Sequence, residues 1–360
     1  MNKAGSTSIQ RAFQTYRDRN IEFIRPRDDT TLHAVLDRTF RRPRDVATFS
    51  NHPEVLEEAA STFDRLMGRS DRSAFISYEN LSIWPDRDVI SAIRDRLLLH
   101  CRSVHVLAYI RSPRSYIRSV LQERLKQYSP PEDLAKLRPH YRERFERWDA
   151  VFGNDAVELV PFRTADLVGG DLLTDVCERI GAQRKKLARQ PQANEAGTLE
   201  SAAALAVWQT ARPDGEQTKS GVGQLQLIRF AQRIHRFGQI SRWGFEGPAI
   251  DQVIEDNTTD IEWISERLGI ADFGDEPPPP STIPNITDLI ALGQDLAPDL
   301  ADWLLETVPG FQPPRSRQTA DLMQAAFVQT AKRDWRAQVF MHRLMPRTLR
   351  AALSPIARRI

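Results

Sequence analysis

Short apolar runs alternate along the first half of the chain with segments whose apolar residues recur at helical spacing. This alternation is typical of α/β proteins. The apolar runs predict β-strands at 73–78, 104–110 and 157–160. The helical spacing predicts helices that begin after residue 8, at 113–126 and at 171–180, the last ended by Gly181.

The second half of the chain is predicted to be mostly helical. Apolar residues recur at helical spacing over 200–210, 225–237, 249–268 and 286–308. The prolines at 277–280 indicate a stiff linker. We therefore expect an α/β domain over 1–273, a Pro-rich linker over 274–285, and a helical C-terminal extension with a basic tail over 286–360.

Composition narrows the classes of protein that the sequence fits. Hydrophobic residues at 41% and charged residues at 27% are typical of globular proteins. No apolar run approaches the roughly 18 residues of a membrane-spanning helix. Cys101 and Cys177 show no zinc-binding spacing and are too few for a disulfide framework. Since the N-terminus also lacks the apolar core of a secretory signal, we expect a cytoplasmic protein.

The net charge of +2 is unevenly distributed. Residues 332–360 contain eight Lys or Arg and one acidic residue, so the rest of the chain carries −5. An acidic body is not typical of proteins that bind nucleic acid, and we predict no such partner. The basic tail carries apolar residues at helical spacing, which leaves two interpretations open. It packs on the acidic body, or it makes peripheral contact with an anionic membrane.

A short polar loop precedes the first predicted helix. It consists of Lys3, Ala4, Gly5, Ser6, Thr7 and Ser8. Glycine lets the backbone approach an oxyanion, and the hydroxyls and the N–H groups of the helix start are hydrogen-bond donors. Lys3 adds a mobile cation. These features predict a phosphate- or sulfate-binding loop, which is not a Walker A loop because its lysine precedes the glycine.

A second candidate site follows the clearest predicted strand, 104–110. Arg111 comes directly after this strand, at the edge where open α/β sheets bind ligands. Ser112 and Pro113 then start a helix, and Ser119 follows Arg111 by about two helical turns. Arg111 and Ser119 are predicted to hold one phosphate, the arginine through a forked, charge-assisted pair of hydrogen bonds.

Together these two segments resemble the PAPS-dependent sulfotransferase family, in particular its bacterial members that resemble carbohydrate sulfotransferases. The family's first motif, Lys-x-Gly-[Ser/Thr]-Thr-x, corresponds to residues 3–8. Its second motif is Arg-x-Pro with a serine eight residues after the arginine, which corresponds to Arg111, Pro113 and Ser119. The resemblance covers about residues 1–273. It implies a P-loop-like three-layer αβα fold with a central parallel sheet, followed here by helical additions.

The resemblance also implies an activity, namely transfer of a sulfuryl group from PAPS (3′-phosphoadenosine 5′-phosphosulfate) to an acceptor hydroxyl of a glycan or small molecule. Gly5, Ser6, Thr7 and Ser8 would hold the 5′-phosphosulfate, with Lys3 stabilising the departing phosphate oxygen. Arg111 and Ser119 would hold the 3′-phosphate. This chemistry requires no metal.

The acceptor hydroxyl needs a base. Glu79 is the first candidate, because it ends the strand before the Arg111 strand, where the family keeps its catalytic His or Glu. His33 is the second, since the unperturbed pKa of histidine suits a base.

The family's loop follows a central strand, whereas only two residues precede Lys3. This difference favours either a start farther upstream or a truncated, catalytically inactive relative that acts as a binding protein. A third interpretation, a P-loop kinase-like protein, is disfavoured by the missing Walker motif and by the lack of a clear metal-binding Asp.

Overall fold

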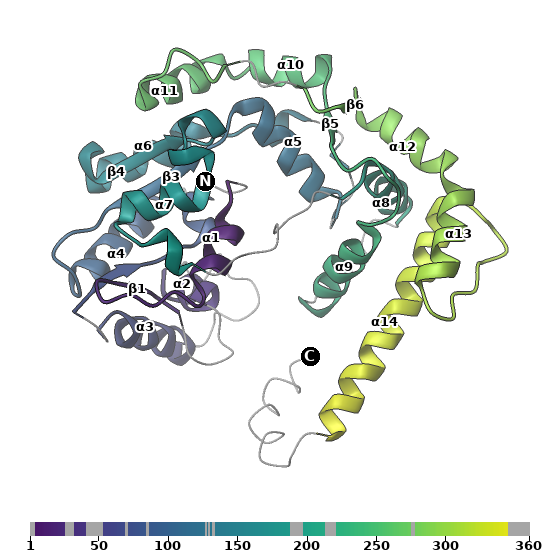
Figure 1. The fold of residues 1–360 in the computed structure, drawn as a ribbon, viewed down its shortest axis with the longest axis horizontal. Coiled ribbons are helices and arrows are strands. Elements are labelled where there is room, and N and C mark those ends of the chain that lie inside the picture. Colours follow the sequence, from purple (N-terminus) through teal and green to yellow (C-terminus); the bar gives the residue numbers. More distant parts are fainter. Residues whose placement is uncertain are drawn as a thin grey trace. The chain divides into compact units, whose positions relative to one another are not determined.

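The computed structural model describes residues 4–25, 32–40, 53–68, 71–83, 86–126, 128, 130–131, 134–187, 197–212, 221–274 and 278–344, with side chains undescribed at 33, 53, 221–225 and 334–344. It is a mixed α/β structure, 62% helical, with short parallel strand pairs (Figure 1). In the described part of the chain, no helix combines the length and apolar character needed to cross a membrane.

The elements follow one another in this order: α1 (Ser6–Phe13), β1 (Ile21–Phe23), α2 (Leu32–Phe40), α3 (Pro53–Met67), β2 (Ser73–Phe75), η2 (Glu79–Ile83), α4 (Arg87–Leu98), β3 (Val106–Ile110), α5 (Pro113–Arg124), α6 (Tyr141–Phe152), β4 (Val157–Pro161), α7 (Leu172–Ile180), α8 (Leu199–Ala211), α9 (Gly221–Ile234), β5 (Trp243–Phe245), α10 (Pro248–Glu255), α11 (Thr258–Leu268), β6 (Ser281–Ile283), α12 (Ile286–Asp295), α13 (Ala297–Thr307) and α14 (Thr319–Leu344). Here η2 is a 3₁₀ turn.

The chain folds into two compact units. Unit 1 comprises 1–116, 139–193 and 257–275, and unit 2 comprises 117–138, 194–256 and 276–360. Within unit 2, α8 and α9 pack with α13 and α14, because the four helices share one apolar core. Within the predicted linker, Ser281–Ile283 forms β6, which pairs in parallel with β5.

Unit 1 contains two parallel strand pairs, β1 with β2 and β3 with β4. Along β3, Leu107 and Tyr109 contribute to one apolar cluster, which also contains residues of α1 and α7. Ala108 and Ile110 contribute to a second cluster, with residues of α2, α3, α4, α6 and α11. Because side chains alternate between the faces of a strand, helices cover the β3–β4 pair on both faces.

Several predicted elements of unit 1 are confirmed. β4 begins at Val157, α5 begins at Pro113, and the Ser115 N–H donates to the Ser112 Oγ over 3.4 Å as a cap. α7 ends at Gly181, whose φ of 71° is the left-handed conformation that favours glycine.

Three elements differ from the prediction. The strand predicted at 73–78 is shorter, because β2 ends at Phe75 and Glu79 begins a 3₁₀ turn. The helix predicted at 249–268 is two helices, with the break at Asp256 and Asn257, residue types that favour helix ends over helix interiors. The helix predicted at 286–308 is also two, because Pro298 has no N–H to donate and favours a new helix start.

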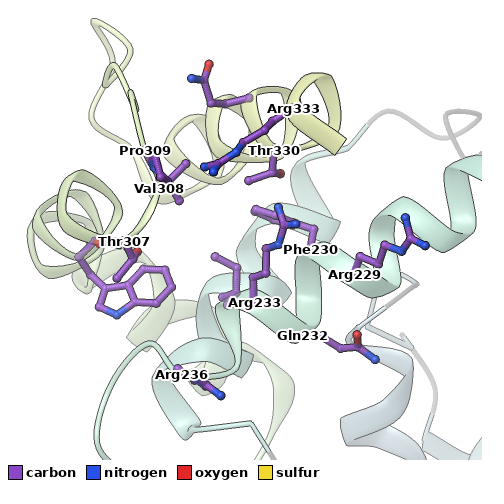
Figure 2. Close-up of a pocket in the computed structure, with 13 residues that line it drawn as sticks. Arg229, Phe230, Gln232, Arg233, Arg236, Thr307, Val308, Pro309, Thr330 and Arg333 are labelled. Atoms are coloured by element: carbon purple, nitrogen blue, oxygen red, sulfur yellow. Dashed lines mark hydrogen bonds between the residues drawn. The ribbon is translucent and has the colours of Figure 1, made fainter. Parts of the chain in front are cut away.

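Unit 2 is built around α8, which is buried on nearly every side. Trp208 of α8 packs edge-on against Phe230 of α9, with ring centroids 5.1 Å apart. α12 approaches α8 so closely that a Cβ on Gly293 would lie 2.3 Å from the Ala203 carbonyl oxygen. A cavity of about 860 Å³ lies beside this core, lined by residues of α9, α13 and α14 (Figure 2).

Candidate functional site

The predicted anion-binding loop leads directly into α1. Gly5 is the residue before the helix, with a φ of 85°, and the Ile9 N–H donates to its carbonyl over 3.1 Å. A Cβ at this position would lie 2.2 Å from Leu172 Cδ2, so both conformation and packing require glycine. Ser6, Thr7 and Ser8 form the half-buried first turn. Their N–H groups have no acceptor within the helix and carry the positive end of its dipole.

The loop contacts the first candidate base. The Ser6 hydroxyl donates to Glu79 Oε2 over 2.9 Å, although the two residues lie 73 apart in the sequence. A second bond holds the same two segments together, because Gln10 Nε2 donates to the Ser77 carbonyl over 3.1 Å. Glu79 is itself half-buried at the start of η2, just past the end of β2. The structure therefore brings a predicted donor and a predicted base into one place.

Arg111 is connected to the loop through Phe162. These two residues follow β3 and β4, and the Phe162 N–H donates to the Ile110 carbonyl over 2.7 Å. The Arg111 guanidinium lies over the Phe162 ring, 5.5 Å from its centroid. A Cβ on Gly5 would lie 3.8 Å from the far end of the same ring. Gly5 and Arg111 are thus neighbours of one aromatic side chain.

The Arg111 backbone is held by residues from outside the strands. Tyr141, the first residue of α6, donates its hydroxyl to the Arg111 carbonyl over 2.6 Å. The Tyr141 N–H in turn donates to Asp260 over 2.8 Å, and its ring stacks on Phe273 with centroids 6.1 Å apart. These contacts fix the point at which the chain leaves β3.

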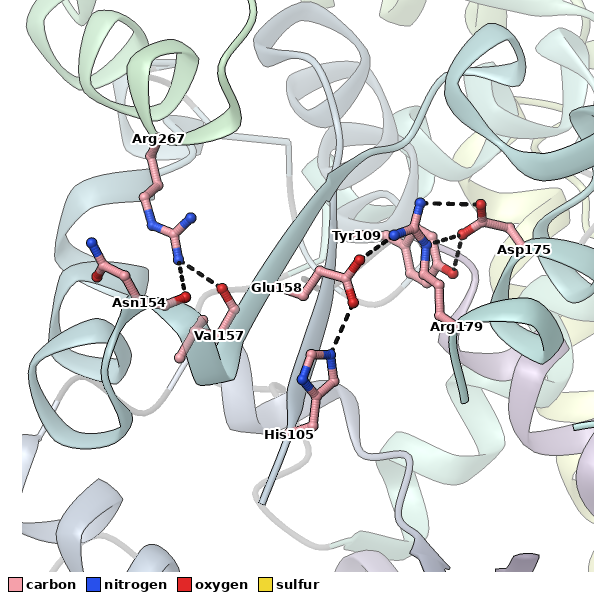
Figure 3. Close-up of polar contacts among 8 residues, drawn as sticks. All are labelled: His105, Tyr109, Asn154, Val157, Glu158, Asp175, Arg179 and Arg267. Atoms are coloured by element: carbon pink, nitrogen blue, oxygen red, sulfur yellow. Dashed lines mark hydrogen bonds and ion pairs between the residues drawn. The ribbon is translucent and has the colours of Figure 1, made fainter. Parts of the chain in front are cut away.

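A polar network joins β3, β4 and α7 (Figure 3). Asp175 of α7 is fully buried, and it accepts from the Tyr109 hydroxyl over 2.6 Å and from Arg179 Nε over 2.7 Å. Arg179 also pairs with Glu158 of β4, which in turn contacts His105 Nε2 over 2.9 Å. Figure 3 shows Arg179 lying between Glu158 and Asp175, so one guanidinium joins β4 to α7.

The hydrogen bonds of this network keep the Asp175 carboxylate ionised. Burial alone would raise the pKa of Asp175, but the hydrogen bonds from Arg179, Tyr109 and the Val168 N–H outweigh it and hold that pKa below its usual range. Burial and the bond to Asp175 raise the pKa of Tyr109. Tyr109 also meets Phe162 edge-on, with centroids 6.2 Å apart. The network therefore supports the ring that Gly5 and Arg111 share.

The arrangement suits an anionic ligand that undergoes group transfer. The N–H groups and hydroxyls at the start of α1 and the Arg111 guanidinium are donors to oxyanions. The Glu79 carboxylate, bonded to Ser6, is an acceptor at the edge of the same loop. A carboxylate beside an oxyanion site can take a proton from an attacking hydroxyl.

Other predicted site residues are placed only in part. Lys3 lies outside the described residues, as does the tail after Leu344. His33 belongs to α2, but its side chain is not described. Asp37 of the same helix accepts from the Tyr78 hydroxyl, so α2 lies beside the segment that carries Glu79. Ser119 lies on the part of α5 that belongs to unit 2, so its pairing with Arg111 remains a prediction.

Sequence reasoning did not identify Phe162, Tyr141 or Asp175. A signal existed for Phe162, which follows the predicted strand 157–160 as Arg111 follows its own strand. The sequence carried no signal for the burial of Asp175, because an acidic residue in an amphipathic helix is normally exposed.

The chain was compared with known proteins in three ways. No family model, no curated protein and no solved structure matches it.

Proposed function

We propose that this protein is a sulfotransferase that moves a sulfuryl group from PAPS to a hydroxyl of a glycan or small molecule. The observation that carries the proposal is the 2.9 Å bond from Ser6 to Glu79. It joins the loop expected to bind the phosphosulfate to the carboxylate expected to accept the proton. The sequence motifs predict each residue separately, and their meeting in the fold supports a common role.

Each residue has a separate task in this proposal. The α1 N–H groups, Thr7 and Ser8 donate to the phosphosulfate oxygens, and Lys3 stabilises negative charge on the departing phosphate oxygen. Arg111 and Ser119 bind the 3′-phosphate, which ATP lacks. Glu79, oriented by Ser6, takes the proton of the attacking hydroxyl, with His33 as the alternative base. Positioning and charge stabilisation supply most of the rate, so no residue is assigned to a metal.

The proposal extends to the fold of unit 1 and to the cellular location of the protein. We propose that unit 1 is a three-layer αβα domain of the P-loop-like kind, and the helices on both faces of the β3–β4 pair support this. We also propose a cytoplasmic protein, with the tail either packed on the body or in peripheral contact with a membrane.

The experiment is a transfer assay. The full chain is incubated with PAPS labelled in its sulfuryl group and with panels of glycan, lipid and phenol acceptors. Label in an acceptor supports the proposal. Binding of PAP, the desulfated product of PAPS, without transfer to any panel would favour the inactive, ligand-binding relative. Binding of neither nucleotide would contradict both.

A further inference from the structure

The cavity in unit 2 has a basic lining. Its lining includes Arg229 and Arg233 of α9, Arg236 just after that helix, and Arg333 of α14. None of its 13 lining residues is an Asp or Glu. Because arginine stays protonated at any physiological pH, the lining carries a charge of about +4.

The arginines approach the cavity from different elements. Figure 2 shows Arg233 extending from α9 toward Thr330 and Arg333 on α14, with Arg229 one turn earlier on α9. Arg229 and Arg233 are four residues apart, where like charges repel and weaken a helix. Residues that break a local rule in this way are expected where they serve a ligand.

The rest of the lining is apolar or aromatic. Phe230 and Ile234 are buried in the core beneath the cavity, and Trp303 and Val308 are half-buried at the α13 side. Trp303 packs against Phe237 with ring centroids 5.7 Å apart, which fixes its plane. An aromatic wall beside several guanidinium groups suits a ring-shaped ligand that carries anionic groups.

Size and charge together define the ligand class. A volume of about 860 Å³ is within the range of small-molecule sites and exceeds the space that one sulfate or phosphate needs. Guanidinium groups bind both oxyanions through paired hydrogen bonds. We propose that this cavity binds a sugar-like ring compound that carries two or more sulfate or phosphate groups. The inference concerns unit 2 alone and does not rest on the proposed transfer activity.

The test is calorimetric binding to the full chain. The probes are a heparin-derived tetrasaccharide, which carries sulfates, inositol hexakisphosphate, which carries phosphates, and neutral maltotetraose. We expect saturable binding of at least one anionic probe, weakened by salt, and none of maltotetraose. The tighter of the two anionic probes identifies the oxyanion. Absence of saturable binding of both anionic probes at about millimolar concentration would overturn the proposal.

Paired variants locate the binding. Arg233→Gln with Arg333→Gln should weaken binding about 100-fold, since each removes charge-assisted hydrogen bonds. Arg315→Gln with Arg317→Gln is the matched control, because both residues are exposed in unit 2 outside the cavity lining and the net charge changes equally. Equal weakening by the two pairs would mean diffuse attraction and would overturn the proposal.

Two further variants keep the test decisive. If the first pair fails to fold, as judged by its thermal unfolding, Arg229→Gln with Arg333→Gln replaces it and should weaken binding similarly. Tetrasaccharide binding that persists in Arg111→Ala is binding outside the site proposed in unit 1. Loss of tetrasaccharide binding in Arg111→Ala would place the ligand in unit 1 and contradict the assignment to this cavity.

Discussion

Arginines occur in both units of this protein, but their surroundings differ. In unit 1, Arg179 pairs with Asp175 and Glu158, and Arg267 forks onto Asp149 with two bonds of 2.9 Å. In unit 2, four arginines line a cavity whose lining includes no carboxylate. The comparison teaches that the content of arginine predicts little, and that the carboxylates beside each arginine have to be located before a role is proposed for it.

Glu79 differs from Asp175 and Glu158, because the partner that the structure gives it is a hydroxyl rather than an arginine. Its carboxylate therefore remains suited to chemistry.

The largest expected effect tests the proposed role of Glu79 as the base. Glu79→Gln should lower sulfuryl transfer by about two to four orders of magnitude, because the amide cannot accept the proton. Affinity for PAP should not change. The measurement is turnover with labelled PAPS, with Glu58→Gln on the exposed side of α3 as the control. Full turnover in Glu79→Gln would remove its role as base and make His33→Ala the next variant to measure.

The second prediction concerns the paired arginines. Asp175→Asn should lower the free energy of unfolding by about 3–5 kcal/mol, because Arg179 then loses a buried partner. Chemical denaturation measures this, with Asp155→Asn as a control on an exposed 3₁₀ turn. If the two variants were equally stable, the network would not hold unit 1 together.

The third prediction separates the units by pH. Burial and then the charge of Lys126 lower the pKa of His235, in unit 2, to about 4. Between pH 6.5 and about 4 the unfolded state therefore binds a proton that the folded state does not, and stability falls as the pH falls. The loss is on the order of 3 kcal/mol over this window.

Hydrogen exchange at pH 7 and pH 5 measures this loss region by region. Protection of α8 and α9 should fall more than protection of β3 and β4. His235→Phe keeps a ring in contact with Gly197. This variant should abolish the extra loss of protection in α8 and α9 at pH 5. A uniform change across both units would argue against His235 as its source.

The smallest expected effect concerns the cavity itself. Arg229→Gln should leave stability unchanged or raise it by a few tenths of a kcal/mol, since it removes repulsion from Arg233 one turn away. Thermal unfolding of the full chain is the measurement. A loss of more than about 1 kcal/mol would show that Arg229 holds the fold and would erase the contrast with unit 1.

Much of unit 1 could be predicted from the sequence, because its signals are local. The strand and helix around Arg111 follow from an apolar run, a serine cap and a proline, all within a few residues. Gly5 of the predicted anion-binding loop is likewise a local signal. The contact between Ser6 and Glu79 was not predicted, because it joins segments 73 residues apart.

The remaining parts of the fold and of the candidate sites could not be predicted, because they depend on contacts between segments that are distant in the sequence. Arg233 and Arg333 belong to helices that are far apart in the chain, and each alone resembles an ordinary surface arginine. Asp175 resembles an exposed helix residue until Tyr109 and Arg179 surround it. A run of prolines likewise indicates a stiff segment but not which helices pack together.

The most direct test of the central claim is the affinity of the full chain for PAP compared with ATP, measured by calorimetry for wild type and Arg111→Ala. We expect wild type to bind PAP at least about tenfold more tightly than ATP, because the proposal assigns the 3′-phosphate to Arg111. Arg111→Ala should lose about 1.5–3 kcal/mol of PAP binding and little of ATP binding. Equal affinity for the two nucleotides, unchanged in Arg111→Ala, would contradict the account.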